Sequence, residues 1–312
     1  MTHGTTGHVG KPDDAERRQA KEERRAEKDE LRAAGELKGQ KARGWTERVL
    51  TRTTSGAIYA IAVLACLYLG TVATTLLIAM MAWLCCSEFY RIMRMCGRLP
   101  NELIGLAAAA AFPLAAYLGP FYLWIVGFVL LLATAWWYVV ALRATISDVA
   151  VTVFGPLYTG LLLTGIVLVR KADPTSAGAL LTLGVMASIW ANDALAYVFG
   201  SRFGAHKLAP KISPNKSWEG VVGGLAGSLI VWSIAAFIQV EGVTWPLAIL
   251  LALTIGTASV IGDLVESRIK RGAGVKDSGN FMPGHGGLLD RTDSMLFGCM
   301  VAFLVLRIGG IV

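Results

Sequence analysis

Residues 262–293 read GDLVESRIKRGAGVKDSGNFMPGHGGLLDRTD, and this polar segment between two long apolar runs is what indicates the fold. The segment is rich in glycine and carries charges of both signs. Acidic side chains flanked by Lys and Arg are what a divalent cation together with a polyphosphate would require. We therefore interpret the segment as the active site of an enzyme embedded in a membrane.

The composition supports a membrane protein. The chain has 312 residues, of which 54% are hydrophobic and 16% charged, and its mean hydropathy is +0.56. Soluble proteins average about 25% charged residues. The five cysteines lie within or beside apolar runs and form no CxxC pair, so neither a zinc site nor a disulfide framework is indicated.

The apolar runs predict an all-α, polytopic membrane domain over residues 49–312. Each run has about the length that a helix needs to cross a hydrocarbon core of ~30 Å. Only Gly70 and Thr71 separate the first two runs, so the total depends on counting them as two. We expect about nine transmembrane helices, at 53–69, 71–90, 101–118, 121–142, 148–169, 178–200, 217–238, 245–267 and 289–309.

The positive residues predict the orientation. With a cytoplasmic N-terminus, fourteen of the Lys and Arg residues beyond residue 48 lie on the cytoplasmic side and three on the other. This asymmetry fits the positive-inside rule. It places both long polar loops, 201–216 and 268–288, on one face and the C-terminus outside. We expect a multi-pass protein of the cell (plasma) membrane whose active site faces the cytoplasm.

Residues 1–48 form a separate, charged region. They contain twelve Lys or Arg and ten Asp or Glu, with almost no apolar residue before Trp45. Such a segment buries no core, so we expect a disordered or solvated helical extension. Because the acidic residues cancel the basic ones, we expect no nucleic-acid partner.

Three carboxylates are the candidate metal ligands. On a helix Asp263 shares one stripe with Ser267 and Lys270, and Asp290 and Asp293 are three residues apart on one helix face. Carboxylates near the membrane interior cost several kcal/mol unless they are paired or bound to a cation. With Mg²⁺ their mutual repulsion becomes coordination, and substrate phosphates are its usual further ligands.

A simpler interpretation of the same carboxylates is a set of ordinary interfacial ion pairs with Arg268 and Arg291. The spacing alone leaves both interpretations open. The loop between the two groups, residues 272–287, holds six glycines. Such a loop can bring backbone N–H groups close to a phosphate, although by itself it also fits a flexible turn. Four basic residues in and around it could donate to phosphate oxygens: Lys270, Arg271, Lys276 and Arg291.

A second polar cluster covers residues 190–220. Asn192 and Asp193 lie inside an apolar helix, where an acidic residue is by default a functional hypothesis, although such a pair can also cap or pack two helices. Ser217 is a candidate N-cap of the next helix, whose first N–H groups could face an anion. The loop before it contributes three candidate substrate-binding lysines: Lys207, Lys211 and Lys216.

These residues resemble a known family. The run from Ser267 to Asp293 resembles the signature of the phosphatidate cytidylyltransferases, also called CDP-diglyceride synthetases. The runs NDALAYVFG and SPNKSWEG, which begin at Asn192 and Ser213, resemble the same family. The likeness covers about residues 50–312. The signature positions found here are Ser267, Lys270, Arg271, Lys276, Asp277, Pro283, His285, Gly286, Gly287, Asp290, Arg291 and Asp293.

The resemblance implies transfer of the cytidylyl group from CTP to phosphatidate, giving CDP-diacylglycerol and pyrophosphate in phospholipid biosynthesis. It implies Mg²⁺ on Asp263, Asp290 and Asp293, with room for a second cation, and it suggests a homodimer. The expected catalytic residues are Asp263, Lys270, Arg271, Lys276, Asp290, Arg291 and Asp293. The expected substrate-binding residues are Asn192, Asp193, Lys207, Lys211, Lys216, Ser217, Ser267, His285, Gly286 and Gly287, with His285 contacting phosphate or shaping the loop.

Other functions remain open from the sequence. A CTP-dependent lipid kinase, or a cytidylyltransferase for another lipid phosphate, could use the same scaffold. A transporter of phosphorylated solutes would also carry intramembrane charges, but these should be spread along a pathway at the midplane and not gathered at one face.

Overall fold

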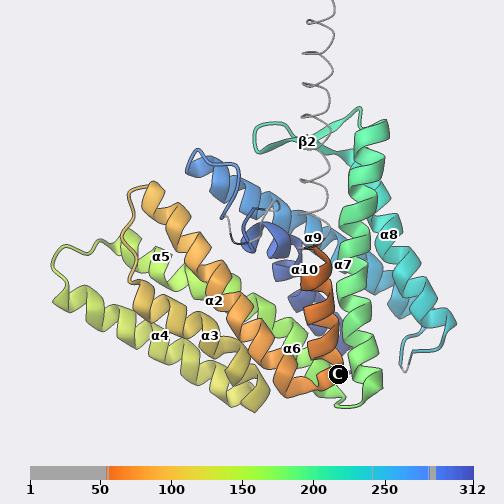
Figure 1. The fold of residues 1–312 in the computed structure, drawn as a ribbon, viewed down its shortest axis with the longest axis horizontal. Helices are drawn as coiled ribbons and strands as arrows, with labels where there is room; N and C mark the ends of the chain where they lie inside the picture. Colours follow the sequence, from red (N-terminus) through yellow and green to blue (C-terminus); the bar gives the residue numbers. More distant parts are fainter. Residues whose placement is uncertain (1–53, 55, 241, 280, 282–285) are drawn as a thin grey trace, which may run out of the picture. The chain divides into compact units, whose positions relative to one another are not determined.

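The computed structural model describes residues 54, 56–240, 242–279, 281 and 286–312. The expected charged extension, residues 1–48, lies outside the described residues. Residues 55–312 form one compact unit of helices, shown in Figure 1.

Each predicted apolar run is helical, with bounds that shift by a few residues. The first described helix spans Gly56–Leu69. The others are α2 Thr71–Met95, α3 Glu102–Leu118, α4 Pro120–Val140, α5 Ile146–Pro156, η1 Leu157–Leu161, α6 Leu162–Ala172, α7 Ser176–Phe203, α8 Trp218–Phe237, α9 Trp245–Gly272 and α10 Leu289–Ile308.

The helices make this a multi-pass membrane protein. Within the described part of the chain, six helical segments are long and apolar enough to cross a bilayer: Thr71–Met95, Pro120–Val140, Ile146–Ala172, Ser176–Phe203, Trp218–Phe237 and Trp245–Gly272. Gly56–Leu69 and Glu102–Leu118 are apolar but shorter. Helix α10 does not meet the same criterion, and it carries Asp290, Arg291 and Asp293 in its first two turns.

The segment predicted as one helix at 148–169 is continuous but not uniform. A π-helical turn, η1, joins α5 to α6 directly after Pro156. Proline has no backbone N–H to donate to the preceding turn, so a local change of helical hydrogen bonding is expected beside it.

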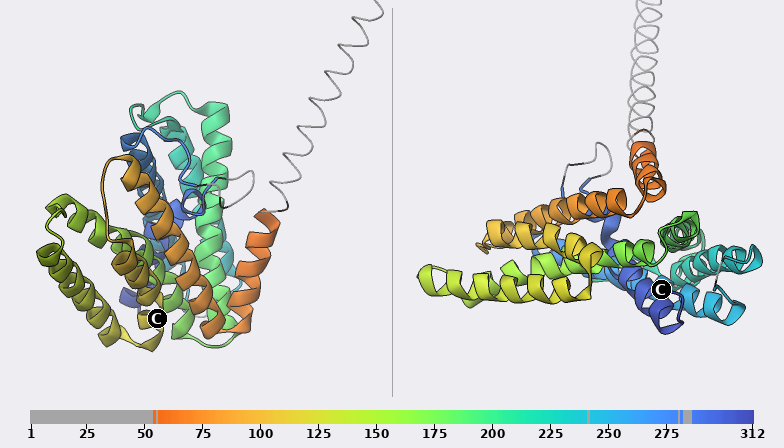
Figure 2. Two further views of the ribbon diagram at one scale, coloured as in Figure 1. Left: turned by 60° about the vertical axis from the view of Figure 1, so that its left-hand side comes forward. Right: turned by 90° about the horizontal axis from the view of Figure 1, so that it is seen from below.

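Small residues allow the helices to approach one another closely. A Cβ on Gly165 of α6 would collide with the backbone of Cys299 on α10, and one on Gly227 of α8 would collide with the Ala191 carbonyl oxygen on α7. Contacts between α7 and α8, α9 and α10, and α2 and α3 dominate the packing, as the views in Figure 1 and Figure 2 show. Helices in membranes associate through such close packing because lipid provides little hydrophobic driving force between them.

The loop expected at 201–216 contains a short antiparallel hairpin, which the all-α prediction did not include. Strand β1, Lys207–Ala209, pairs with β2, Ser213–Ser217, and Lys207 faces Ser217 in the register. The predicted N-cap is confirmed: the Ser217 hydroxyl accepts a hydrogen bond from the Gly220 N–H, at 3.2 Å, where α8 begins.

Helix α9 continues beyond its predicted end at residue 267. It runs to Gly272, so that Lys270 and Arg271 lie in its last turn and not in a loop. Basic side chains are favoured at this end of a helix because its free carbonyl groups carry partial negative charge. The extension keeps Lys270 on the same rigid element as Asp263.

Basic residues at the opposite end of the bundle have structural partners. The side chain of Arg170 is buried and donates from Nε to the Leu67 carbonyl oxygen and from Nη1 to that of Asp173, at 3.0 and 2.6 Å. Lys171 lies over the ring of Tyr117. These contacts tie the turns at that end of the bundle together.

Gly165→Ala should lower the thermal unfolding midpoint in detergent, because its methyl group would overlap the α10 backbone and force α6 away from it. Overpacking of this kind typically costs about 1–3 kcal/mol. Gly127→Ala is the matched control, since a Cβ there meets no atom within 4 Å. The control should keep or slightly raise the midpoint, because alanine favours helix more than glycine does. Equal midpoints for the two variants would contradict the packing described.

Candidate active site

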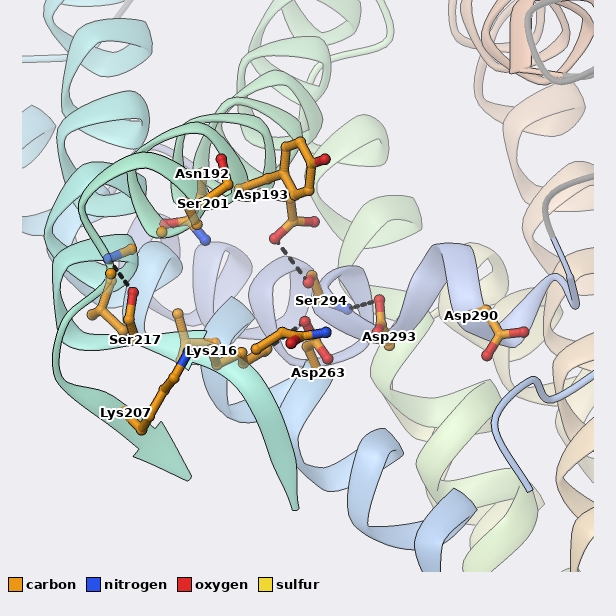
Figure 3. A pocket seen from close by; sticks show the side chains of 18 of the residues that line it. Asn192, Asp193, Ser201, Lys207, Lys216, Ser217, Asp263, Asp290, Asp293 and Ser294 are labelled. Atoms are coloured by element: carbon orange, nitrogen blue, oxygen red, sulfur yellow. Dashed lines mark hydrogen bonds and ion pairs between the residues drawn. The ribbon is translucent and has the colours of Figure 1, made fainter. Parts of the chain in front are cut away.

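A pocket of roughly 610 Å³ lies where α7, the hairpin, α8, α9 and α10 meet (Figure 3). Its wall combines basic, acidic and amide side chains from segments far apart in the sequence. The lining residues include Asn192, Asp193, Tyr197, Ser201, Lys207, Asn215, Lys216, Ser217, Asp263, Asp290, Arg291, Asp293 and Ser294. Nine of the predicted site residues are therefore brought to one pocket.

Glycines in the neighbouring helices position the α7 side of the pocket. Asn192 is fully buried, and its Oδ1 atom occupies the space that a Cβ on Gly224 or Gly256 would need. The next residue, Asp193, is exposed into the pocket. Its Oδ1 accepts a hydrogen bond from the Ser294 hydroxyl of α10, at 3.0 Å. The hydrogen bond between Asp193 and Ser294 therefore joins α7 to α10 at the pocket.

Lys216 of the hairpin makes an ion pair with Asp263 of α9. The distance from Nζ to Oδ2 is 2.5 Å, and both side chains are partly exposed. The other carboxylate oxygen of Asp263 accepts a hydrogen bond from the Ser267 hydroxyl, one helical turn later, at 3.2 Å. The predicted stripe of Asp263 and Ser267 is therefore observed.

Asp293 lies beside Asp263 because α9 and α10 approach closely at this level. A Cβ on Gly262 would collide with the Asp293 carbonyl oxygen. The Asp293 carboxyl group lies near those of Asp263 and Asp193, and its Oδ1 accepts a hydrogen bond from the Ser294 N–H at 2.8 Å. Three carboxyl groups thus lie along the wall of one pocket, and carboxylate oxygens are the ligands that a divalent cation prefers.

Lys270 connects α9 to the start of α10. Its Nζ lies 2.5 Å from Oε2 of Glu266 and 2.7 Å from Oδ1 of Asp290. Glu266 is fully buried, and the Lys270 side chain is 12% exposed. The simpler interpretation of the acidic residues therefore holds in part: ion pairs form, but Asp263 and Asp290 pair with Lys216 and Lys270 and not with Arg268 or Arg291.

Asp290 is held differently from the other two predicted metal ligands. Its carboxylate also accepts hydrogen bonds from the N–H groups of Ser278 and Gly287, at 2.9 and 2.8 Å to Oδ2. In Figure 3 it is drawn apart from Asp263 and Asp293. Across the described residues, no three His, Cys, Asp or Glu side chains form a group ready to hold a metal ion. The expected convergence of three aspartates is thus not preformed, because lysines and backbone amides hold two of them.

The remaining predicted residues that the structure describes lie outside the pocket wall. Arg271 donates to the Val275 carbonyl oxygen at 2.9 Å and closes the end of α9. Lys211 and Lys276 are exposed. His285 lies outside the described residues. Four others contact acidic residues of the pocket wall. Ser267 donates to Asp263, and Lys270 and the Gly287 N–H donate to Asp290. Gly286 lies against the Asp290 carboxylate.

Sequence reasoning missed a carboxylate on α2. Glu88 is buried, and it accepts hydrogen bonds from the Ser278 hydroxyl and from the N–H groups of Leu288 and Leu289. The only signal for it in the sequence was an acidic residue inside an apolar run, in CCSEFYR. The spacing within the polar segment does not distinguish Glu266 from an exposed helical residue either.

Comparison with known proteins identifies the family of this chain. A family model described as the cytidylyltransferase family matches residues 50–309. The chain belongs to the cytidylyltransferase family. The match covers every described element of the pocket, and only the charged region and the chain end fall outside it. Family membership places the chain among nucleotidyltransferases.

Three similar proteins carry the name phosphatidate cytidylyltransferase. The chain is 40% identical over 179 residues to a phosphatidate cytidylyltransferase of Pseudomonas aeruginosa, covering 54% of this chain and 65% of the relative. It is 47% identical over 126 residues to that of Haemophilus influenzae, covering 38% and 42%. It is 40% identical over 179 residues to that of Synechocystis sp., covering 49% and 60%. The chain spans less than two thirds of the length of each.

Lys270→Met should destabilise the protein strongly, since it leaves the buried Glu266 carboxylate without its cation. Removing one partner of a buried pair typically costs about 3–5 kcal/mol. The double variant Lys270→Met with Glu266→Gln should regain part of the thermal unfolding midpoint in detergent. Arg94→Ala breaks the exposed pair with Glu102 and should cost less than about 1 kcal/mol. A Lys270→Met protein as stable as Arg94→Ala would contradict the stabilising role of the Lys270 ion pairs with Glu266 and Asp290.

Proposed function

We propose that this chain transfers the cytidylyl group from CTP to phosphatidate, giving CDP-diacylglycerol and pyrophosphate. The observation that carries the proposal is the single pocket in which Lys207, Lys216 and Arg291 face Asp193, Asp263 and Asp293 at one end of an apolar bundle. Family membership and the names of the curated relatives support the same reaction.

The reaction joins two anions. An oxygen of the lipid phosphate attacks the α-phosphorus of CTP, a new P–O bond forms, and the bond from the α-phosphorus to the bridging oxygen breaks with departure of pyrophosphate. The phosphate of phosphatidate is mostly ionised at neutral pH, because the second pKa of such a monoester is about 6. No general base is therefore required, and the task is charge neutralisation and alignment.

The basic side chains are placed for that task. Lys216 and Lys207 come from the two strands of the hairpin, and Arg291 comes from the first turn of α10. They reach the pocket from opposite sides and would take phosphate oxygens. Ser217 fixes the start of α8 beside them, where free N–H groups favour an anion. Lys270 would act from behind by holding Asp290 in place.

The acidic residues fit a divalent cation in donor type. Their carboxylate oxygens are what Mg²⁺ prefers, and Mg²⁺ is usually held by one or two carboxylates together with substrate phosphates. Asp263 and Asp293 lie at one wall and are the first candidates. Asp290, the third expected ligand, would join them by giving up its lysine. A cation held here would neutralise charge on the phosphates of CTP, and a second cation remains part of the proposal.

The decisive test is an assay of purified protein with CTP labelled in the cytidine, phosphatidate and Mg²⁺. Label in the lipid fraction, with equimolar pyrophosphate, supports the proposal. A parallel assay with CTP labelled in the γ-phosphate tests for a lipid kinase, which would transfer that label to lipid and leave the cytidine label in solution. Transport of a phosphorylated solute into proteoliposomes, without any lipid labelling, would indicate a transporter. Removing Mg²⁺ with a chelator should abolish labelling, and adding it back should restore labelling.

Asp263→Asn and Asp293→Asn should each raise the Mg²⁺ concentration for half-maximal activity at least about tenfold, because each removes a charged ligand. Asp290→Asn should abolish turnover while the protein remains inserted in the membrane. Metal titrations of lipid labelling, with Glu102→Gln as an exposed control, measure these effects. Near-normal activity of Asp290→Asn would remove that residue from the metal site.

We also propose the finer topology: nine crossings, a cytoplasmic N-terminus and a pocket that opens to the cytoplasm of a cell (plasma) membrane protein. With the exposed Cys96 changed to serine, Lys207→Cys should react with a membrane-impermeant maleimide only from the cytoplasmic side. Lys171→Cys should react only from the other side. Labelling of both from one side would overturn the proposed orientation. The homodimer implied by the family resemblance is testable by light scattering in detergent.

A further inference from the structure

The carboxylate of Glu88 accepts hydrogen bonds from both ends of the glycine-rich loop that precedes α10. We propose that Glu88 is a positioning residue for the proposed reaction, which holds Ser278, Gly279 and residues 287–289 in register so that α10 presents its acidic residues to the pocket. We call these five residues the loop neck. The inference rests on the proposed function, because the neck belongs to the segment that carries Asp290.

Ser278 is fixed through every one of its polar groups. Its hydroxyl donates to Oε2 of Glu88 at 2.8 Å, and its N–H donates to Oδ2 of Asp290 at 2.9 Å. Its carbonyl oxygen accepts from Nη2 of Arg91, one helical turn after Glu88 on α2. The residue is fully buried. A serine held in this way cannot shift without breaking contacts to both α2 and α10.

The other side of the neck is the start of α10. Oε1 of Glu88 accepts from the Leu288 N–H at 3.0 Å, and Oε2 accepts from the Leu289 N–H at 2.9 Å. Helix α10 has no cap from its own side chains. Glu88 therefore caps it from another helix, where an anion also complements the partial positive charge of the helix start.

The neck glycines leave the space that the carboxylate occupies. A Cβ on Gly279 would collide with Oε1 of Glu88, and one on Gly287 would collide with Oε2 of Glu88 and with the Ser278 hydroxyl. Glycine at these two positions is thus explained by the carboxylate from α2. Two carboxylates therefore contact the loop neck. Glu88 does so from α2, and Asp290 accepts hydrogen bonds from the Ser278 and Gly287 N–H groups.

The geometry separates this role from substrate binding. Glu88 does not line the pocket, and it meets only hydrogen-bond donors. Glutamine at this position would place its NH₂ group against the Leu288 or Leu289 N–H in either orientation of the amide. One backbone donor at the helix start would then lose its acceptor. Two acceptor oxygens are therefore required at this position, and the shape of the side chain alone would not suffice.

The test is a double-variant cycle between Glu88→Ala and Gly279→Ala, with Glu88→Gln as the variant that keeps side-chain volume and Glu102→Gln as the exposed control. Gly279→Ala should lower kcat at least about tenfold in the native background and less than about twofold in the Glu88→Ala background, where the collision with the Glu88 carboxylate is removed and a 3.1 Å contact with the Gly287 Cα remains. Glu88→Gln should lower kcat at least about tenfold with KM for CTP changed less than about threefold. Glu102→Gln should match the native protein.

Unfolding midpoints in detergent, measured for every variant, make the result interpretable. The same coupling between Glu88→Ala and Gly279→Ala should be seen in the midpoints, which tests the contact even if the native protein transfers no cytidylyl group. Absence of transfer by the native protein would refute the proposed function alone. Equal effects of Gly279→Ala in both backgrounds would overturn the contact. A Glu88→Gln protein with native kcat per folded molecule would overturn the positioning role.

Discussion

The structure depends on neutralising charged groups inside an apolar helical bundle. An isolated charge in such surroundings is costly, whereas a paired or hydrogen-bonded charge is tolerated. Lys216 therefore pairs with Asp263, and Lys270 lies between Glu266 and Asp290. The Lys216–Asp263 and Lys270–Asp290 pairs each join two elements that are separate in the chain, whereas the Lys270–Glu266 pair lies within α9. The same pairs that make the charges tolerable thus also determine how the hairpin, α9 and α10 are placed around the pocket.

Neutralisation is incomplete at one wall of the pocket. Asp193 and Asp293 have hydrogen bonds from Ser294, and neither makes an ion pair in the described part of the chain. With Asp263 beside them, three carboxyl groups lie along this wall, and the basic side chains of Lys207 and Arg291 also line the pocket. An arrangement with both signs suits a ligand that consists of a cation and a polyphosphate, and either component alone would leave charge uncompensated.

Helix α2 supports this wall of the pocket, although none of its residues is among those that line the pocket. Glu88 caps α10 and holds Ser278, while Asp290 holds the same neck from the side of the pocket. The aspartates of the first turns of α10 are thereby fixed relative to the bundle. Catalytic groups need such support, since small errors in their position are costly in rate.

The amino-acid sequence alone predicts the helical membrane fold and all seven charged residues that line the pocket. Long apolar runs must form helices because a bilayer offers no partners to an unpaired backbone, and the motif residues were distinctive in type and spacing. The Ser217 cap followed from local rules. Only the tertiary structure decided that Asp290 pairs with Lys270, that a hairpin carries Lys216, and that Glu88 belongs to the loop neck. These pairings join segments far apart in the chain, and which carboxylate meets which donor depends on how closely the helices pack at glycines such as Gly262.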